Sequence, residues 1–310
     1  VEHPEQSDAP EGGVRFIMSV RAVGEGHISS IEFRAGTVTA DGEISIDPTS
    51  GFVSAAQIAP SARYRRKKVV YAIDFPSTST VDERAIFPVS ANESKGLEDA
   101  RFVRFVEDDG SVLYYATYTA YNGHAISPQL IETRDFLHFR ILTLAGNAVH
   151  DKGMALFPRR IAGRYAMLSR QDNQNILIMF SDDPHTWSDP QVIVQPAAIW
   201  ESTKIGNCGS PIETEAGWLV ITHGVGPMRE YRLGAVLLDL DDPTRVIGRL
   251  DQPLIAPEGS ERNGYVPNVV YSCGSLLHNG NLILPYAVSD QATTIATIPV
   301  EDLLAMLLRA

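Results

Sequence analysis

Cysteine is scarce in this sequence: Cys208 and Cys273 are the only two among 310 residues. A disulfide framework is thereby excluded, because such scaffolds need several cysteine pairs. One disulfide between these two stays open, but free cysteines are usually buried, so we expect two buried thiols. No CxxC, HExxH or repeated histidine pair is present, and the sequence therefore predicts no metal site.

Basic residues are also in deficit. Lysine and arginine number 26 against 38 aspartates and glutamates, which gives a formal net charge of −12. A general nucleic-acid binder would need a basic face, so we expect no nucleic acid as partner. Basic side chains gathered in one cleft would indicate a specific anion site, because the net negative charge of the protein otherwise repels anions.

Long apolar runs are missing as well. No stretch of 18 apolar residues occurs, so we expect no membrane span. No secretory signal is recognisable, and we predict a cytoplasmic protein. Residues 1–13 are polar and are predicted to be a lead-in. Residues 14–310 are predicted to form a single catalytic domain, since all-β domains often exceed 200 residues.

Helical periodicity is confined to the tail, residues 300–309. Short segments rich in β-branched and aromatic residues dominate the rest of the chain and predict strands. Clear examples are residues 14–20, 112–118, 165–168, 218–222 and 282–286. All but the first of these closely follow a glycine turn signal such as Asp-Asp-Gly or His-Asn-Gly. The pattern predicts an all-β fold.

Acidic turns recur along the chain at a nearly constant interval. Asp135, Asp183, Asp242 and Asp302 are separated by 48, 59 and 60 residues. In an all-β chain, a period of this length is typical of propeller blades, each a four-stranded sheet. Residues from 14 to about 47 supply one more unit, so we predict a five-bladed β-propeller. The alternative is a pair of β-sandwiches.

A compact charged group precedes one of the predicted strands. Glu98 and Asp99 are adjacent carboxylates, and Arg101 follows two residues later. Partly buried charges need partners, and one carboxylate would then be free to transfer a proton. The alternative is a solvated turn, because charged side chains are mostly exposed.

Four basic residues stand at repeat-equivalent strand ends: Lys152, Arg170, Lys204 and His223. Considered one at a time, each lysine or arginine is more simply interpreted as a surface charge, and His223 as a hydrogen-bonded structural histidine. Propellers bind their ligands on loops at one end of the central channel. Converging there, the four side chains would form an anion site for a phosphate or a carboxylate.

Several segments resemble glycoside hydrolase family 130. They are GLEDARFVRF, KGMALFPRRIAGRYAMLSRQ, KIGNCGSPIETEAGWLVITHGV, YRLGAVLLDLDDPTRVIGRL and GYVPNVVYSCG, from about residue 96 to the end. The resemblance implies a five-bladed propeller that cleaves β-mannosides with inversion, by phosphorolysis or hydrolysis. It implies a β-mannoside oligosaccharide as substrate and inorganic phosphate as co-substrate of a phosphorylase, with no cofactor. The family commonly forms oligomers, so a homo-oligomer is compatible with it.

The resemblance also implies roles for individual residues. It makes Asp99 the general acid, which delivers its proton through a hydroxyl of the bound mannose. Arg170, Lys204 and His223 match three phosphate ligands of the family phosphorylases. The fourth ligand is an arginine in those enzymes, and Lys152 occupies its position here. Lysine keeps the positive charge but cannot form the two parallel hydrogen bonds of a guanidinium.

Four further residues are predicted to contact the substrate. Asp290 matches an acidic residue that contacts the sugar in the family. Glu98 and Arg101 flank the general acid, and Tyr231 is one of the aromatic residues beside the basic loops. Most aromatic side chains of a propeller pack in its core, which is the alternative for Tyr231.

Two alternatives accompany the favoured prediction, which is an inverting β-mannoside phosphorylase releasing mannose 1-phosphate. Some family members hydrolyse β-1,2 linkages instead, and an inverting hydrolase uses a carboxylate to activate water. Glu201, Glu230 and Glu261 are the candidates for that base. The second alternative is a mannoside-binding propeller without catalysis, against which the presence of Asp99 argues.

Overall fold

The computed structural model describes residues 1–6, 8–60 and 69–309. The chain divides into two compact units. The first consists of Val1–Lys152 with Asp183–Trp187, and the second of Gly153–Asp182 with Ser188–Ala310. The predicted domain bounds also include residues 7, 61–68 and 310, which lie outside the described residues. Strands dominate both units, which confirms the all-β prediction.

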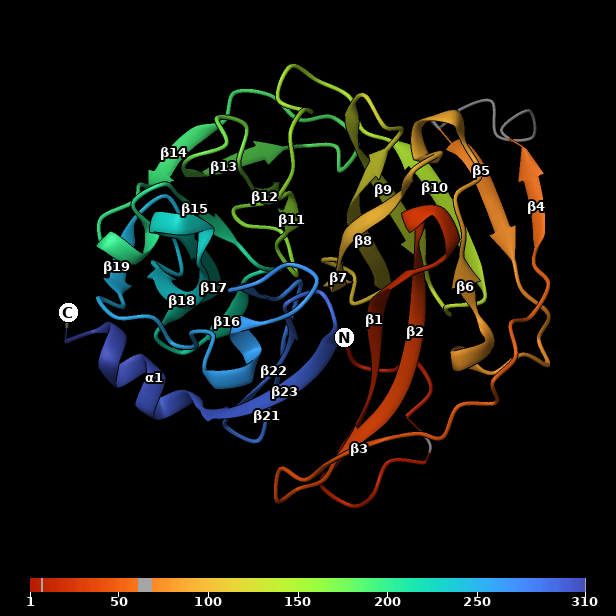
Figure 1. The fold of residues 1–310 in the computed structure, drawn as a ribbon, viewed down its shortest axis with the longest axis horizontal. Helices are drawn as coiled ribbons and strands as arrows, with labels where there is room; N and C mark the ends of the chain where they lie inside the picture. The colour runs from red at the N-terminus through yellow and green to blue at the C-terminus, as the bar shows by residue number, and fades with distance from the viewer. Residues whose placement is uncertain (7, 61–68, 310) are drawn as a thin grey trace. The chain divides into compact units, whose positions relative to one another are not determined.

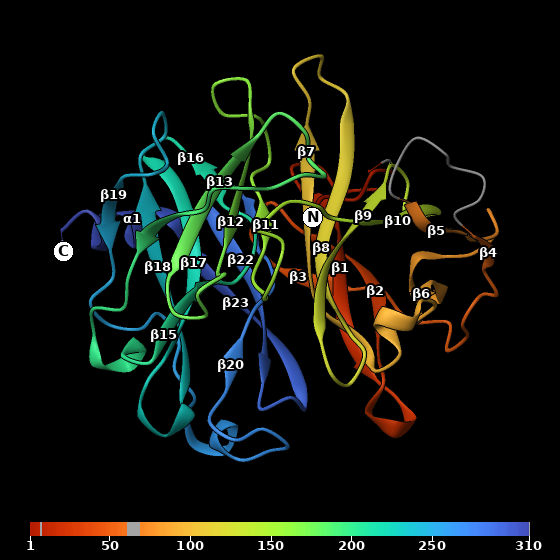
Figure 2. The same cartoon turned by 90° about the horizontal axis from the view of Figure 1, so that it is seen from above.

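The first unit contains β1 (Val14–Val23), β2 (Ser29–Val38), β3 (Ile44–Ile46), β4 (Gln57–Pro60), β5 (Val69–Asp74), β6 (Ala85–Ile86), β7 (Gly96–Val106), β8 (Val112–Tyr121), β9 (Ile126–Thr133) and β10 (His138–Thr143). They form one hydrogen-bonded sheet in the order β1-β2-β7-β8-β9-β10-β5-β4, with β3 and β6 also paired to β2. The long antiparallel ribbons β1–β2 and β7–β8 are plain in Figures 1 and 2. Short 3-10 turns lie at η1 (Glu25–His27), η3 (Val81–Glu83) and η4 (Ala91–Glu93).

Aromatic side chains fill the core of the first unit. Phe33 is fully buried on β2 and stacks on Phe139 of β10, with ring centroids 5.7 Å apart. Phe102 and Phe136 contact the Phe33 ring edge-on, with ring centroids 5.7 and 5.6 Å away. Such edge-to-face arrangements stabilise a core beyond the apolar area that they bury. Buried residues alternate with less buried ones along β7, as expected of a strand with one face in the core, whereas β8 and β9 are buried almost throughout.

The second unit contains β11 (Ala155–Leu156), β12 (Tyr165–Ser169), β13 (Ile176–Ser181), β14 (Gln191–Val194), β15 (Lys204–Asn207), β16 (Ile212–Thr214), β17 (Gly217–Val225), β18 (Tyr231–Leu238), β19 (Val246–Arg249), β20 (Val270–Tyr271), β21 (Leu276–His278), β22 (Asn281–Val288) and β23 (Ala292–Pro299). They form three antiparallel sheets: β11–β14, β15–β19 and β20–β23. The 3-10 turns are η5 (Ile199–Glu201), η6 (Pro227–Arg229) and η7 (Gly259–Arg262). The chain ends in helix α1 (Val300–Leu307), where the sequence predicted it (Figure 1).

The sheets of the second unit are largely buried. Every residue of β17 is buried, as expected of a central strand between two neighbours. Helix α1 packs its apolar face, with Leu303 and Leu307, against β18 and β23. Cys208 is buried and Cys273 is half-buried, and the two do not form a disulfide. The prediction of two buried thiols is therefore correct for Cys208 only, because Cys273 lies near the surface. No helix among the described residues is long and apolar enough to cross a membrane.

The acidic repeat seen in the sequence corresponds to a repeated turn. Asp135, Asp183 and Asp242 each follow the third strand of a four-stranded antiparallel run. In each case Oδ1 accepts the main-chain N–H two residues further along, at 2.9–3.2 Å, which closes an Asx turn. Asp302 differs, since it lies in α1. The hydrogen-bonded order gives four-stranded runs, and a closed ring of five blades stays a prediction.

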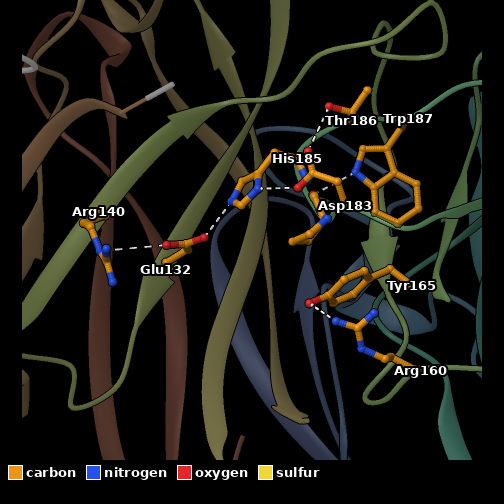
Figure 3. Close-up of polar contacts among 9 residues, drawn as sticks. Glu132, Arg140, Arg160, Tyr165, Asp183, His185, Thr186 and Trp187 are labelled. Atoms are coloured by element: carbon orange, nitrogen blue, oxygen red, sulfur yellow. Dashed lines mark hydrogen bonds and ion pairs between the residues drawn. The ribbon is translucent and has the colours of Figure 1, made fainter. Parts of the chain in front are cut away.

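The segment Asp183–Trp187 contacts the sheet of the first unit through a partly buried histidine. Figure 3 shows His185 between two carboxylates, with Nε2 2.8 Å from Glu132 Oε1 and Nδ1 2.8 Å from Asp183 Oδ1. Glu132 also lies 3.8 Å from Arg140 Nε. Burial acts to lower the pKa of His185, but the two carboxylates together outweigh it, and this pKa is raised.

Candidate active site

A glutamate closes each of the 3-10 turns η4, η5 and η7, and the first two of these turns precede β7 and β15. Glu93 accepts the main-chain N–H groups of Val89 and Ser90 at 3.0 and 2.8 Å. Glu201 accepts two N–H groups in the same way, both at 3.0 Å, and Glu261 accepts one at 3.1 Å. These contacts satisfy main-chain donors that would otherwise be buried without partners. The turn therefore fixes where the following strand begins.

The first two turns place two strands in equivalent positions. Asp99 follows Glu93 by six residues, and Asn207 follows Glu201 by six. The pairing register agrees with this alignment. Gly96 on β7 pairs with the last residue of β8, and Lys204 on β15 pairs with the last residue of β17. Asn207 is thus the structural counterpart of Asp99 in the next repeat.

Asp99 occupies a strained backbone position. The pairing of β7 with β8 shifts register between Glu98 and Arg101, which marks a β-bulge, and Asp99 has a φ of 53° inside it. A bulge turns a side chain away from the regular pleat, and positive φ in a residue other than glycine is often found at functional sites. Arg101 is buried and its Nη1 donates to the main-chain oxygen of Asp99 at 3.4 Å. The solvated-turn alternative for this segment is therefore wrong.

Glu98 is held between two cations. Its Oε2 accepts from Lys152 Nζ at 2.6 Å, and its Oε1 accepts from Arg21 Nη2 at 3.1 Å. The Glu98 side chain is 16% exposed, so these are partly desolvated contacts that orient all three groups. The structure thus brings Lys152 next to the carboxylate beside Asp99, all within the first unit. Arg21, on β1, adds a second cation there.

Arg170 and His223 are in direct contact within the second unit. Nη1 of Arg170, just after β12, lies 2.8 Å from Nε2 of His223 on β17. An arginine only donates, so Nε2 must accept and the imidazole proton sits on Nδ1. Nδ1 lies 3.9 Å from the Cys208 sulfur. This geometry is consistent with both predictions for His223. It is a buried, hydrogen-bonded histidine, and it lies beside a basic residue of the predicted anion site.

Gly206 leaves the space that the Arg170–His223 pair occupies. Gly206 pairs with His223 across the β15–β17 ladder. A Cβ at this position would lie 2.5 Å from His223 Cε1 and 3.1 Å from Arg170 Nη1. Side chains two residues apart on a strand share a face, so Lys204 points to the same face as this pair. Its Nζ donates to Asn173 Oδ1 at 3.2 Å.

Two tyrosines border His223. Tyr231, the first residue of β18, lies nearly parallel to the imidazole with ring centroids 6.0 Å apart. Tyr271 on β20 meets the same imidazole edge-on at 4.9 Å. Both tyrosines are only partly buried. They supply aromatic faces with polar ends, a combination suited to a sugar ring.

A family model described as beta-1,4-mannooligosaccharide phosphorylase matches residues 76–309. The chain belongs to glycoside hydrolase family 130. Among its relatives, a 1,2-beta-oligomannan phosphorylase of Thermoanaerobacter sp. (strain X514) is 36% identical over 266 residues, 80% of this chain and 85% of the relative. A beta-1,2-mannobiose phosphorylase of Listeria innocua is 30% identical over 239 residues, 74% of this chain and 65% of the relative.

The fold of the family is found in solved structures. The Listeria innocua beta-1,2-mannobiose phosphorylase, in complex with beta-1,2-mannobiose, gives a TM-score of 0.67 at 23% identity. The match covers 97% of this chain and 94% of that chain. The resemblance to family 130 that the sequence motifs carried is thereby confirmed. Asp99, Lys152, Arg170, Lys204, His223 and Asp290 all lie within the matched range.

The three alternative bases have different surroundings. The fully buried Glu201 carboxylate closes its own turn and pairs with Arg249. Glu261 also closes a turn. Glu230 lies 3.1 Å from Arg232 and forms a second, longer ion pair with Arg262. These contacts favour a structural role for Glu201 and Glu261, and the assignment of a base stays a prediction.

Two polar residues beside the predicted ones were missed by sequence reasoning. Arg21 lies 77 positions before Glu98, and no local pattern connects them. Asn207 has a signal, since Pro88 and Pro196 each precede a capping glutamate by five residues and align Asn207 with Asp99. Asp290, by contrast, was predicted and lies exposed in the β22–β23 hairpin with a φ of 54°.

Proposed function

We propose that this chain is an inverting β-mannoside phosphorylase that releases mannose 1-phosphate from β-mannosides. The observation that carries the proposal is the contact between Arg170 and His223, with Lys204 facing the same way. In a chain of net charge −12, a buried arginine held by a histidine rather than a carboxylate points to an anionic ligand. The phosphorylase names of the relatives support the same reaction.

Asp99 is the proposed general acid. The reaction forms a bond between a phosphate oxygen and the anomeric carbon while the glycosidic C–O bond breaks, and the leaving oxygen takes a proton from Asp99. The bulge and the positive φ hold this carboxyl out of the regular pleat of β7. Arg101, buried against the main chain of Asp99, keeps the bulge in place.

Inorganic phosphate is the proposed nucleophile. Arg170, Lys204 and His223 of the second unit would bind it, and Lys152 is the fourth residue that the family resemblance assigns to phosphate. Glu98 holds Lys152 in one orientation and lowers the entropy lost when the lysine binds an anion. No cofactor takes part in this reaction.

The sugar would lie against the partly exposed tyrosines. Tyr231 offers a ring face beside His223, and Asp290 offers an exposed carboxylate for sugar hydroxyls. Glu98 and Arg101 lie on strand β7 on either side of the proposed general acid, Asp99, and would contact the sugar there. These assignments are supported by the arrangement of each group within its own unit.

An inverting β-1,2-mannosidase is the second candidate. It needs a glutamate free to activate water, and the turn-closing contacts of Glu201 and Glu261 disfavour both for this role. A mannoside-binding protein without turnover would not need the strained backbone of Asp99.

We further propose that the described sheets are blades of one five-bladed β-propeller forming a single catalytic domain. The Asx turns at Asp135, Asp183 and Asp242 support this, because each joins the last two strands of a four-stranded run. A cytoplasmic location and a homo-oligomer are proposed on family resemblance.

Product analysis tests the function. The chain is incubated with β-1,2-mannobiose and with β-1,4-mannosyl-glucose, each with and without inorganic phosphate. Mannose 1-phosphate that forms only with phosphate establishes the phosphorylase. Free mannose at equal rates in both reactions overturns it in favour of the hydrolase. Tight mannoside binding with no product under either condition supports the binding protein.

A further inference from the structure

Four buried polar side-chain atoms of the second unit have no hydrogen-bond partner among the described residues: Arg170 Nε, Glu201 Oε2, Asn207 Oδ1 and Ser210 Oγ. Two of them, Nε of Arg170 and Oδ1 of Asn207, lie on either side of one glycine. Arg170 is 8% exposed and Asn207 is 0% exposed. Leaving such groups unpaired costs about 1–3 kcal/mol each, so each of them favours a bound partner such as a ligand or an ordered water molecule.

The two atoms flank one point above Gly153. A Cβ built on Gly153 would lie 4.0 Å from Arg170 Nε and 3.9 Å from Asn207 Oδ1. Gly153 has a φ of 89°, a conformation that disfavours any side chain there. The amide of Asn207 is oriented by its Nδ2, which donates to the Gly209 carbonyl at 3.4 Å. Its Oδ1 is therefore the atom that faces this point.

The chemistry of the pair restricts what it can bind. Arg170 Nε–H only donates and Asn207 Oδ1 only accepts. One oxygen atom that satisfies both must accept a hydrogen bond and donate one, so it belongs to a hydroxyl or to a water molecule. The Arg170 guanidinium has no carboxylate partner among the described residues, and a buried cation requires a counter-charge. An anion that carries a hydroxyl meets both conditions.

We infer that Asn207 accepts the P–O–H hydrogen of inorganic phosphate bound by Arg170, and thereby selects hydrogen phosphate over sulfate. This inference rests on the proposed phosphorylase function, since it assigns the nucleophile to the same anion site. Sulfate has the same shape but carries no proton near neutral pH. Its oxygens would face the Asn207 carbonyl without a hydrogen between them, and two acceptors in contact repel each other.

Calorimetric titration with sodium phosphate and with sodium sulfate tests the inference on the full chain. The wild-type protein is expected to bind phosphate about tenfold or more tightly than sulfate, the value of one buried hydrogen bond to an anion. In Asn207→Leu the ratio of the two affinities is expected to fall towards one. In Asn207→Asp, which keeps an acceptor, both affinities fall but the preference for phosphate is retained. Asn281→Leu, at the β21–β22 hairpin, is the matched control.

The inference is overturned if the wild type binds the two anions equally well or binds no phosphate. It is also overturned if a folded Asn207→Leu variant keeps the wild-type ratio of the two affinities. The wild-type ratio decides the matter even if that variant does not fold. Product analysis separates this result from the proposed function. Mannose 1-phosphate formation together with an unchanged ratio rejects only the role of Asn207. Free mannose in both reactions rejects the phosphorylase. The ratio of phosphate affinity to sulfate affinity then still shows whether Asn207 accepts a hydrogen bond from the anion.

Discussion

Arg170 Nη1 lies 2.8 Å from Nε2 of His223, so the imidazole accepts from the guanidinium and carries its own proton on Nδ1. The histidine therefore fixes the orientation of the arginine. A guanidinium held in this way presents its remaining N–H groups to a ligand without first losing side-chain freedom. The pair is the basis of the first prediction.

Arg170→Lys should raise the KM for phosphate by about tenfold or more, with a smaller effect on mannoside binding. Lysine keeps the charge but cannot reach His223 and the anion together. Initial rates at varied phosphate measure the effect. Arg164→Lys is the control, because Arg164 is half exposed and its ion pair with Asp182 is at the surface. An Arg170→Lys variant with wild-type KM would remove Arg170 from the phosphate site.

Gly206→Ala should lower both stability and activity. The added methyl group would lie 2.5 Å from His223 Cε1 and would force the Arg170–His223 pair apart. Overpacking of this kind costs about 1–3 kcal/mol. Gly274→Ala is the matched control, since a Cβ there meets nothing within 4 Å. Thermal unfolding and phosphorolysis rates for the two variants should diverge, and equal behaviour would contradict the tight packing at Gly206.

Asp99→Asn should reduce kcat by about 10²- to 10⁴-fold, the usual contribution of a general acid. Phosphate binding, measured by calorimetry, should be unchanged because the backbone bulge is kept. The control is Asp41→Asn in an exposed turn. Near-normal turnover in Asp99→Asn would mean that another group protonates the leaving oxygen.

Glu201→Gln should lower the melting temperature while leaving kcat within about twofold. Gln keeps an acceptor for the turn but loses the charge that pairs with Arg249, and breaking a buried ion pair is destabilising. Differential scanning calorimetry and product assays with and without phosphate check this. A loss of rate on the order of 100-fold without loss of stability would instead identify Glu201 as the base of a hydrolase.

His185 should make stability depend on pH. Its pKa is raised in the folded chain, so its contribution is fully present below the ordinary histidine value of about 6.5 and is lost as pH rises through the folded pKa. The melting temperature of His185→Gln should therefore fall below that of the wild type by about 2 °C or more at pH 6. The difference should shrink above pH 8. His124→Gln, at an exposed turn, should show no such trend. A gap that grows with pH would contradict the raised pKa.

Much of the fold follows from local sequence. The strand segments at residues 112–118 and 218–222 lie within β8 and β17, and the apolar tail forms α1 where helical spacing predicted it. The acidic turns were also predictable, because an aspartate can close an Asx turn with its own neighbours. These features need only contacts between residues close in sequence. The family motifs carried Asp99 and the basic residues in the same way, as linear patterns.

The tertiary structure alone decided which side chains meet. Arg170 and His223 are 53 residues apart, and Glu98 lies 54 positions before Lys152, so only the folding of the chain brings each pair together. The sequence allowed Glu201 to be a base, but a 3-10 turn closes around its carboxylate. Side-chain identity is local, whereas partner, burial and free hydrogen-bonding capacity depend on chain segments that meet only in the folded molecule. For that reason the sequence identified the chemistry available to this protein, and the fold determined which groups can perform it.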